Sequence, residues 1–201
     1  MKENLTKVQE SILVLCTLQA LLEEYKECLK KEKDNSKSVI YAIITSQIIL
    51  TSCSFIEEWE LFGNLIKEDS RILELRKIVK PAIDRINKWS DMRYYRNSIV
   101  AHNHRIKKEN NSIAILKIDR KLKCPNSYFD FMLLMGCIFI IKKILLYIFK
   151  NEYNQLIPRL KNIKNIESVN SIEDKETFHS EFNKITKAVQ SLTKTIKFSK
   201  S

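Results

Sequence analysis

The sequence is poor in the residues that build turns: it has only two glycines, Gly63 and Gly136, and three prolines among 201 residues. Sandwiches and doubly wound sheets need many tight connections, which depend on such residues. Phosphate loops, dinucleotide fingerprints and nucleophile elbows need closely spaced glycines, so the commonest nucleotide-hydrolysing and hydrolase classes are excluded. Long helices with few connections fit this composition, and the abundant Lys, Glu, Leu and Ile suit helices.

Cysteine pairs suited to metal binding or redox chemistry are also absent. The chain has five cysteines, an odd number, and no Cys-x-x-Cys spacing. Cys16, Cys53 and Cys137 lie within apolar helical patterns, so we expect buried, reduced thiols and a reducing compartment. Charged residues at Lys7 and Glu10 do not fit a secretory signal. These features predict a cytoplasmic protein.

Clean apolar runs of the length that spans a membrane are missing too. Residues 39–55 carry no charge, but polar residues interrupt them, and the apolar stretch 131–141 ends at Lys142. A spanning helix needs about 20 apolar residues. We interpret both stretches as central helices of a soluble bundle and expect no membrane contact.

Positive charge is in excess. Lys and Arg number 35 against 24 Asp and Glu, which gives a formal net charge of +11. Such a balance favours polyanionic partners, among them RNA. A lysine-rich composition alone also produces this excess, so the charge supports a nucleic-acid partner without identifying one.

Apolar residues recur at spacings of three and four, which predicts an all-α bundle of four long helices at about 5–31, 37–65, 70–102 and 125–153. Pro81 lies inside the third pattern and should kink or split that helix. Residues 112–118 are the one strand-like stretch. We expect them to form a short extended ribbon on the outside of the bundle.

The C-terminal part has a different pattern. Pro158 and the polar run 161–174 indicate a linker, which predicts a helical bundle over 1–157 and an appendage over 158–201. Apolar residues then repeat at spacings of 4, 3, 4, 3 and 4, namely Phe178, Phe182, Ile185, Val189, Leu192 and Ile196. This heptad seam predicts an amphipathic helix that lies on the bundle, forms a dimer contact or holds a partner protein.

Chemistry-bearing residues concentrate at 93–105, which contains three arginines, two tyrosines and two histidines. Histidine titrates near neutral pH, as a proton shuttle must. Arginine presents a fixed fork of donors to phosphate. RNA carries its own 2′-OH nucleophile, so this pattern needs no metal or cofactor. Arg96 and His102 are the candidates for this chemistry.

The Arg96-Asn97…Ala101-His102 pattern resembles the motif of the HEPN superfamily (higher eukaryotes and prokaryotes nucleotide-binding). The Arg-Asn and Ala-His pairs are similar to those of members linked to bacterial abortive infection. The resemblance covers about residues 5–153. It implies a dimeric, metal-independent endoribonuclease that acts as a toxin or anti-phage abortive-infection effector. His102 would be the general acid/base, Arg96 would neutralise the pentacoordinate phosphate, and Asn97 would orient the phosphate or the histidine.

One departure from the family concerns its regulation. Some members carry, two residues after the histidine, a tyrosine that a partner nucleotidyltransferase modifies, and here that position is His104. A nucleotidyltransferase partner is therefore not implied. Further candidates are auxiliary groups at His104, Arg93, Glu57 and Glu58, and RNA contacts at Arg93, Tyr94 and Arg105.

Helix geometry complicates the site. Residues six apart lie about 120° apart around an ideal helix, so Arg96 and His102 do not share a face. Either the helix unwinds near Ala101, or a two-fold mate completes the site, which predicts a homodimer.

Several alternatives remain open for the motif. In the first, the motif is structural: Arg96 pairs with Glu57 or Glu58, and His102 caps the third helix. In the second, a HEPN-like fold binds RNA or a protein without catalysis. A metal site at His102 and His104 is disfavoured, because side chains two apart on a helix diverge and no further Cys or His lies nearby in sequence.

Overall fold

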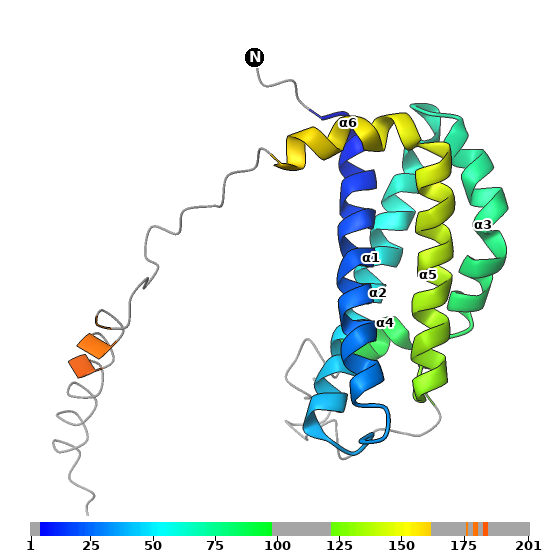
Figure 1. The fold of residues 1–201 in the computed structure, drawn as a ribbon. Coiled ribbons are helices and arrows are strands. Elements are labelled where there is room, and N and C mark those ends of the chain that lie inside the picture. The colour runs from blue at the N-terminus through cyan, green and yellow to red at the C-terminus, as the bar shows by residue number, and fades with distance from the viewer. Residues whose placement is uncertain (1–4, 98–121, 162–175, 177–178, 181–182, 185–201) are drawn as a thin grey trace, which may run out of the picture. The chain divides into compact units, whose positions relative to one another are not determined.

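A computed structural model describes residues 5–97, 122–161, 176, 179–180 and 183–184. The elements within these residues are α1 (Lys7–Lys31), α2 (Val39–Gly63), the 3-10 helix η1 (Asn64–Lys67), α3 (Arg71–Asn87), α4 (Met92–Tyr95), α5 (Tyr128–Ile148) and α6 (Lys150–Lys161). The predicted all-α fold is therefore confirmed for the part of the chain that the structure describes (Figure 1).

Side-chain caps fix where three of the long helices begin. At α1, Thr6 Oγ1 accepts from the Gln9 backbone N–H at 3.2 Å, and Gln9 Oε1 accepts from the Thr6 N–H at 3.1 Å. Ser38 and Ser127 cap α2 and α5, each accepting from the N–H three residues later, at 3.0 and 3.1 Å. These caps satisfy N–H groups that have no partner within the helix.

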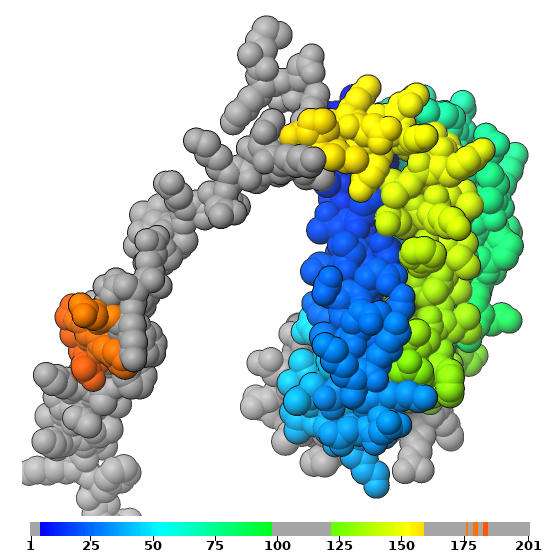
Figure 2. All heavy atoms as spheres, viewed as in Figure 1, coloured from blue at the N-terminus to red at the C-terminus, as the bar shows by residue number. Residues whose placement is uncertain are grey.

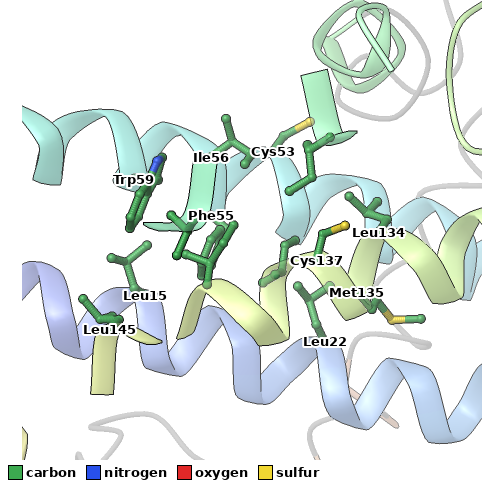
Figure 3. Packing of buried hydrophobic residues seen from close by; sticks show 14 of the residues in the cluster. Leu15, Leu22, Cys53, Phe55, Ile56, Trp59, Leu134, Met135, Cys137 and Leu145 are labelled. Atoms are coloured by element: carbon green, nitrogen blue, oxygen red, sulfur yellow. The ribbon is translucent and has the colours of Figure 1, made fainter. Parts of the chain in front are cut away.

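The core lies where α1, α2, α3 and α5 meet. α2 packs on α1, while α5 packs on α1 and α3. Phe55, Phe62 and Phe149 are the largest fully buried side chains, and the Phe62 and Phe149 rings meet edge to face with centroids 5.7 Å apart. Figure 3 shows Leu15 of α1, Leu145 of α5, and Phe55 and Trp59 of α2 among the buried side chains between these helices. Burial of this apolar surface is the main stabilising term of the bundle.

The predicted fourth helix over 125–153 is wrong at its C-terminal end. α5 ends at Ile148, and the backbone leaves the helical region at Phe149 (φ −107°, ψ 34°) before α6 begins at Lys150. The Phe149 side chain is 0% exposed. The chain therefore changes direction at a residue that is anchored in the core.

α6 crosses one end of the bundle in Figures 1 and 2. Gln9 Nε2 of α1 donates to Gln155 Oε1 of α6 at 3.0 Å, and Arg71 at the start of α3 pairs with Glu152. Leu156 is buried beneath the helix. The chain divides into two units, Met1–Lys161 and Asn162–Ser201, so the first unit runs past residue 157 and includes Pro158 within α6.

The predicted third helix over 70–102 is also wrong. α3 ends at Asn87, and α4 begins at Met92 after a short turn. The N–H groups of Lys88 and Trp89 bond carbonyls three residues back, at 3.3 and 2.9 Å. This 3-10 pattern tightens and ends the helix. The proline inside α3 does not split that helix.

Three sequence predictions fall on residues beyond the described ranges. These are the end of the motif at 98–105, the ribbon at 112–118 and the six apolar seam residues of the C-terminal helix. The tail residues that the structure does describe are helical and exposed, namely Glu176, His179, Ser180, Asn183 and Lys184.

Two helices are long and apolar enough to cross a membrane by length and composition, Val39–Lys67 and Tyr128–Ile148, with mean hydropathies of 1.9 and 2.2. Within those windows 44% and 39% of the residues are buried against other helices, and core helices of soluble proteins pass the same test. α5 nevertheless exposes apolar side chains on its outer face, namely Phe129, Leu133, Ile140 and Tyr147. The absence of membrane contact stays a prediction.

Candidate functional site

The two arginines of the motif's N-terminal part pair with two glutamates of α2. Arg96 Nη1 donates to Glu57 Oε1 at 2.6 Å, and Arg93 Nη2 donates to Glu60 Oε1 at 2.7 Å. The arginines are three residues apart and so are the glutamates, a spacing that places each pair of side chains on one helix face. The two ion pairs therefore form a ladder, the Arg–Glu ladder, which ties α4 and the turn after it to α2.

The Arg96 guanidinium is held from two sides. Its Nε donates to Asn97 Oδ1 at 2.9 Å, in addition to the bond from Nη1 to Glu57. The Arg96 side chain is only 19% exposed, whereas that of Glu57 is 43% exposed. A guanidinium has five N–H donors, so donors remain for a further acceptor. Among the residues that the structure describes, Asn97 and Glu57 thus orient Arg96 without occupying all of its donors.

The charge of the Arg–Glu ladder cancels. Arg93 and Arg96 contribute two positive charges, while Glu57 and Glu60 contribute two negative ones. Coulomb attraction of a phosphate by this group is correspondingly weak at a distance. A favourable field for a polyanion must therefore come from other basic residues of the +11 chain.

The side chains around the Arg–Glu ladder differ in their exposure. Cys53, one turn before Glu57, is 1% exposed, and burial raises the pKa of its thiol to about 11. The thiol therefore stays protonated near neutral pH and is a poor nucleophile. Tyr95 packs against the core, whereas Tyr94 is 50% exposed and is free to stack on a ligand.

Two hydrogen bonds form a clasp between Asp91, just before α4, and Lys123, just before α5. Asp91 Oδ2 accepts from the Lys123 N–H at 2.8 Å, and the Asp91 N–H donates to the Lys123 carbonyl at 3.2 Å. Asp91 and Lys123, which lie on either side of residues 98–121 in the sequence, are therefore neighbours in space. Next to the clasp, burial raises the pKa of the Cys124 thiol to about 12.

The predicted site residues divide into three groups. The structure brings Arg96, Asn97 and Glu57 together, with Arg93 one turn away. Glu58 is half-buried and makes no ion pair with any residue of the described ranges. His102, His104 and Arg105 lie outside those ranges. Arg96 pairs with a glutamate of the second helix, as one of the alternatives predicts, and that glutamate is Glu57.

Sequence reasoning did not assign Glu60 to Arg93. The signal for this pair is the matched spacing: Glu57 and Glu60 are three residues apart, and so are Arg93 and Arg96. Two antiparallel helices can form both ion pairs only in one register. Among the residues that the structure describes, no three His, Cys, Asp or Glu side chains come together as a metal site.

No family model, curated protein or solved structure matches this chain. The resemblance to the HEPN superfamily therefore depends on the Arg96-Asn97…His102 pattern and the order of the long helices. Activity, partners and localisation stay predictions.

Proposed function

We propose that the chain is a metal-independent endoribonuclease whose reacting groups are Arg96, Asn97 and His102. One observation carries the proposal: Glu57 and Asn97 hold the Arg96 guanidinium at 2.6 and 2.9 Å, six residues before His102 in the sequence. Donors that are oriented in advance stabilise charge that develops in a transition state, because they need not reorganise during the reaction.

The proposed reaction is an internal transfer within RNA. The imidazole of His102 takes the proton of a ribose 2′-OH while O2′ attacks the adjacent phosphorus. The bond from phosphorus to O5′ breaks, O5′ takes a proton, and the products are a 2′,3′-cyclic phosphate and a 5′-hydroxyl. The remaining donors of Arg96 bind the non-bridging oxygens as charge accumulates on them.

The reaction needs a base at O2′ and an acid at O5′, and one neutral histidine cannot be both at once. A two-fold homodimer with residues 93–104 of both chains facing one cleft supplies the second group, the partner's His102. The cysteine pattern favours a cytoplasmic site of action, and so does the interpretation of the two apolar stretches as central helices of a soluble bundle. Light scattering tests the dimer, and a monomer at micromolar concentration contradicts it.

Unrestrained RNA cleavage harms the cell that makes the enzyme. We therefore include in the proposal a role as a toxin or abortive-infection effector that an antidote restrains. The apolar seam from Phe178 to Ile196 is the surface offered to a protein antitoxin. Deletion of residues 170–201 should abolish binding of that partner and leave RNA cleavage unchanged.

A second candidate is a HEPN-like module that binds RNA or a protein without catalysis. The charge balance of the Arg–Glu ladder favours it, since Glu57 and Glu60 neutralise both arginines. In that case Arg96 serves to hold α4 on α2, and its loss lowers stability with no chemical consequence.

RNA cleavage in excess EDTA separates the two candidates. The purified full chain should cut RNA and leave 2′,3′-cyclic phosphate and 5′-hydroxyl ends, and a strand with a single 2′-deoxy sugar at the cut position should survive. Cleavage that EDTA abolishes, or that leaves 3′-hydroxyl and 5′-phosphate ends, rejects the proposed mechanism. Binding without any cleavage selects the second candidate.

A further inference from the structure

A cavity of about 200 Å³ opens beside the Arg–Glu ladder, between α2, the end of α3 and α4. Part of its lining is buried and apolar, with Ile56, Ile86, Trp89 and Met92 all at most 9% exposed. In Figure 3, Ile56 extends from α2 on the side away from Leu15 of α1. The cavity is therefore distinct from the packed core between α1 and α2.

The exposed lining of this cavity is polar. Asn87 and Ser90 lie at the end of α3 and in the turn after it, and the Arg93–Glu60 pair completes the mouth. Asn87 is exposed and its side-chain amide makes no hydrogen bond with any residue in the described part of the chain. An amide presents one donor group and one acceptor together, which is the combination that reads a base edge.

Size and shape restrict the ligand. Pockets for drug-sized molecules measure about 300–1,000 Å³, so 200 Å³ admits one planar ring system rather than a whole nucleotide. Trp89 provides an aromatic wall, and the Arg85 guanidinium lies 4.0 Å from the centroid of its ring. That contact orders the indole before any ligand arrives.

We propose that this cavity, the base cavity, binds an unpaired nucleobase of the RNA next to the cleaved phosphate. The cleavage part of this inference depends on the function proposed above. Arg93 belongs to the mouth of the cavity and Arg96 follows one helical turn later, a spacing of about 5–6 Å between Cβ atoms. A base inserted against Trp89 therefore brings its own phosphate or the next one toward Arg96.

The cavity gives the enzyme a means of choosing its cleavage site. Trp89 is 8% exposed and Arg85 covers one face of its ring, so the part of the indole that lines the cavity contributes apolar contact to any base. Asn87 contributes discrimination, because its amide must match the donor and acceptor on the base edge. Loss of the amide should therefore reduce base preference more than it reduces overall RNA binding.

Binding tests the base cavity without requiring catalysis. Fluorescently labelled 2′-O-methyl hexanucleotides of A, C, G and U cannot be cleaved at the 2′ position, and each is titrated against the full chain by anisotropy. One base should bind about fivefold or more tightly than the weakest one, and Asn87→Ala should bring that ratio close to one. Asn154→Ala, at an exposed position of α6, is the matched control and should leave the ratio unchanged.

A second variant blocks the cavity without removing the Asn87 amide, so that loss of base preference can be separated from loss of the fold. Ser90→Trp fills the mouth of the cavity from an exposed position and should abolish the preference. Circular dichroism and the thermal midpoint should match wild type for both variants. Equal binding of all four hexanucleotides, or a preference that survives both substitutions, overturns the base cavity.

Cleavage mapping separates the failure of this inference from that of the proposed function. Wild type should cut RNA with one base enriched at a fixed position beside the cut, and Asn87→Ala should remove the enrichment. Cleavage without base enrichment rejects the base cavity and leaves the endoribonuclease intact. Base-selective binding with no cleavage rejects the endoribonuclease and retains the cavity.

Discussion

The two ion pairs of the Arg–Glu ladder should contribute unequally to stability. The side chains of Arg96 and Glu57 are 19% and 43% exposed, whereas those of Arg93 and Glu60 are 49% and 56% exposed. Exposed pairs contribute about 0.2–1 kcal/mol, and hydrogen bonds to charged groups about 1.5–3 kcal/mol where water is excluded. Since Glu57 stays partly solvated, we expect a coupling of about 1 kcal/mol for Arg96–Glu57 and about 0.3 kcal/mol for Arg93–Glu60.

Double-mutant cycles measure these couplings. One cycle uses Glu57→Gln, Arg96→Gln and the double variant, and the matched cycle uses Glu60→Gln and Arg93→Gln. Urea unfolding followed by circular dichroism gives each free energy of unfolding, and the coupling is the deviation from additivity. Raising the salt concentration should weaken the exposed Arg93–Glu60 coupling proportionally more, because buried charges are screened less.

Equal couplings in the two cycles would refute this reasoning, and so would a larger coupling for Arg93–Glu60. A coupling near zero for Arg96–Glu57 means that the pair adds no net stability, because desolvation and lost side-chain freedom offset the attraction. In that case the pair no longer argues that Arg96 is held in advance, and the main support for the proposed catalytic role is lost.

Three further predictions test the fold. Gly136→Ala should raise the free energy of unfolding by about 0.5–1 kcal/mol, because no atom lies within 4 Å of the added Cβ; a loss of stability in thermal unfolding indicates that the outer face of α5 is covered. At pH 8, iodoacetamide should label exposed Cys28 and spare Cys53, because burial raises the pKa of Cys53 to about 11 and leaves only about one thiol in a thousand ionised; mass spectrometry that finds both labelled at similar rates contradicts this. Phe55→Ala should cost about 3–5 kcal/mol, whereas Phe129→Ala, at a side chain 74% exposed, should stay within about 0.5 kcal/mol by urea unfolding.

The sequence predicts the long helices well where caps and apolar spacing agree, as at the junction between α1 and α2. It fails after Asn87 for a physical reason. Ile86, Trp89 and Met92 are all buried and continue the spacing of three residues. A tight turn with bonds three residues back keeps such residues on one side just as a helix does. Apolar periodicity alone therefore cannot detect this break.

The site was predicted in part for a similar reason. A glutamate of α2 was expected beside Arg96, but neighbouring positions 57 and 58 could not be separated by sequence alone, because the rotation of α2 against α4 decides between them. Cys53, Ile56 and Glu60 line the base cavity, and that face of the helix also carries Glu57. The cavity itself depends on the turn between α3 and α4. The sequence predicts one continuous helix to His102, which has no such turn and therefore no such cavity.

The rate of RNA cleavage in EDTA by matched histidine and arginine variants tests the central claim most directly. His102→Ala should lower the rate by about 10²–10⁴-fold through loss of proton transfer. Arg96→Lys should fall almost as far, since an ammonium cannot replace the guanidinium fork, whereas His179→Ala, in the C-terminal tail, should match wild type. The claim is contradicted if wild type and His102→Ala cleave total cellular RNA at the same rate, or if both bind it equally well and neither cleaves it.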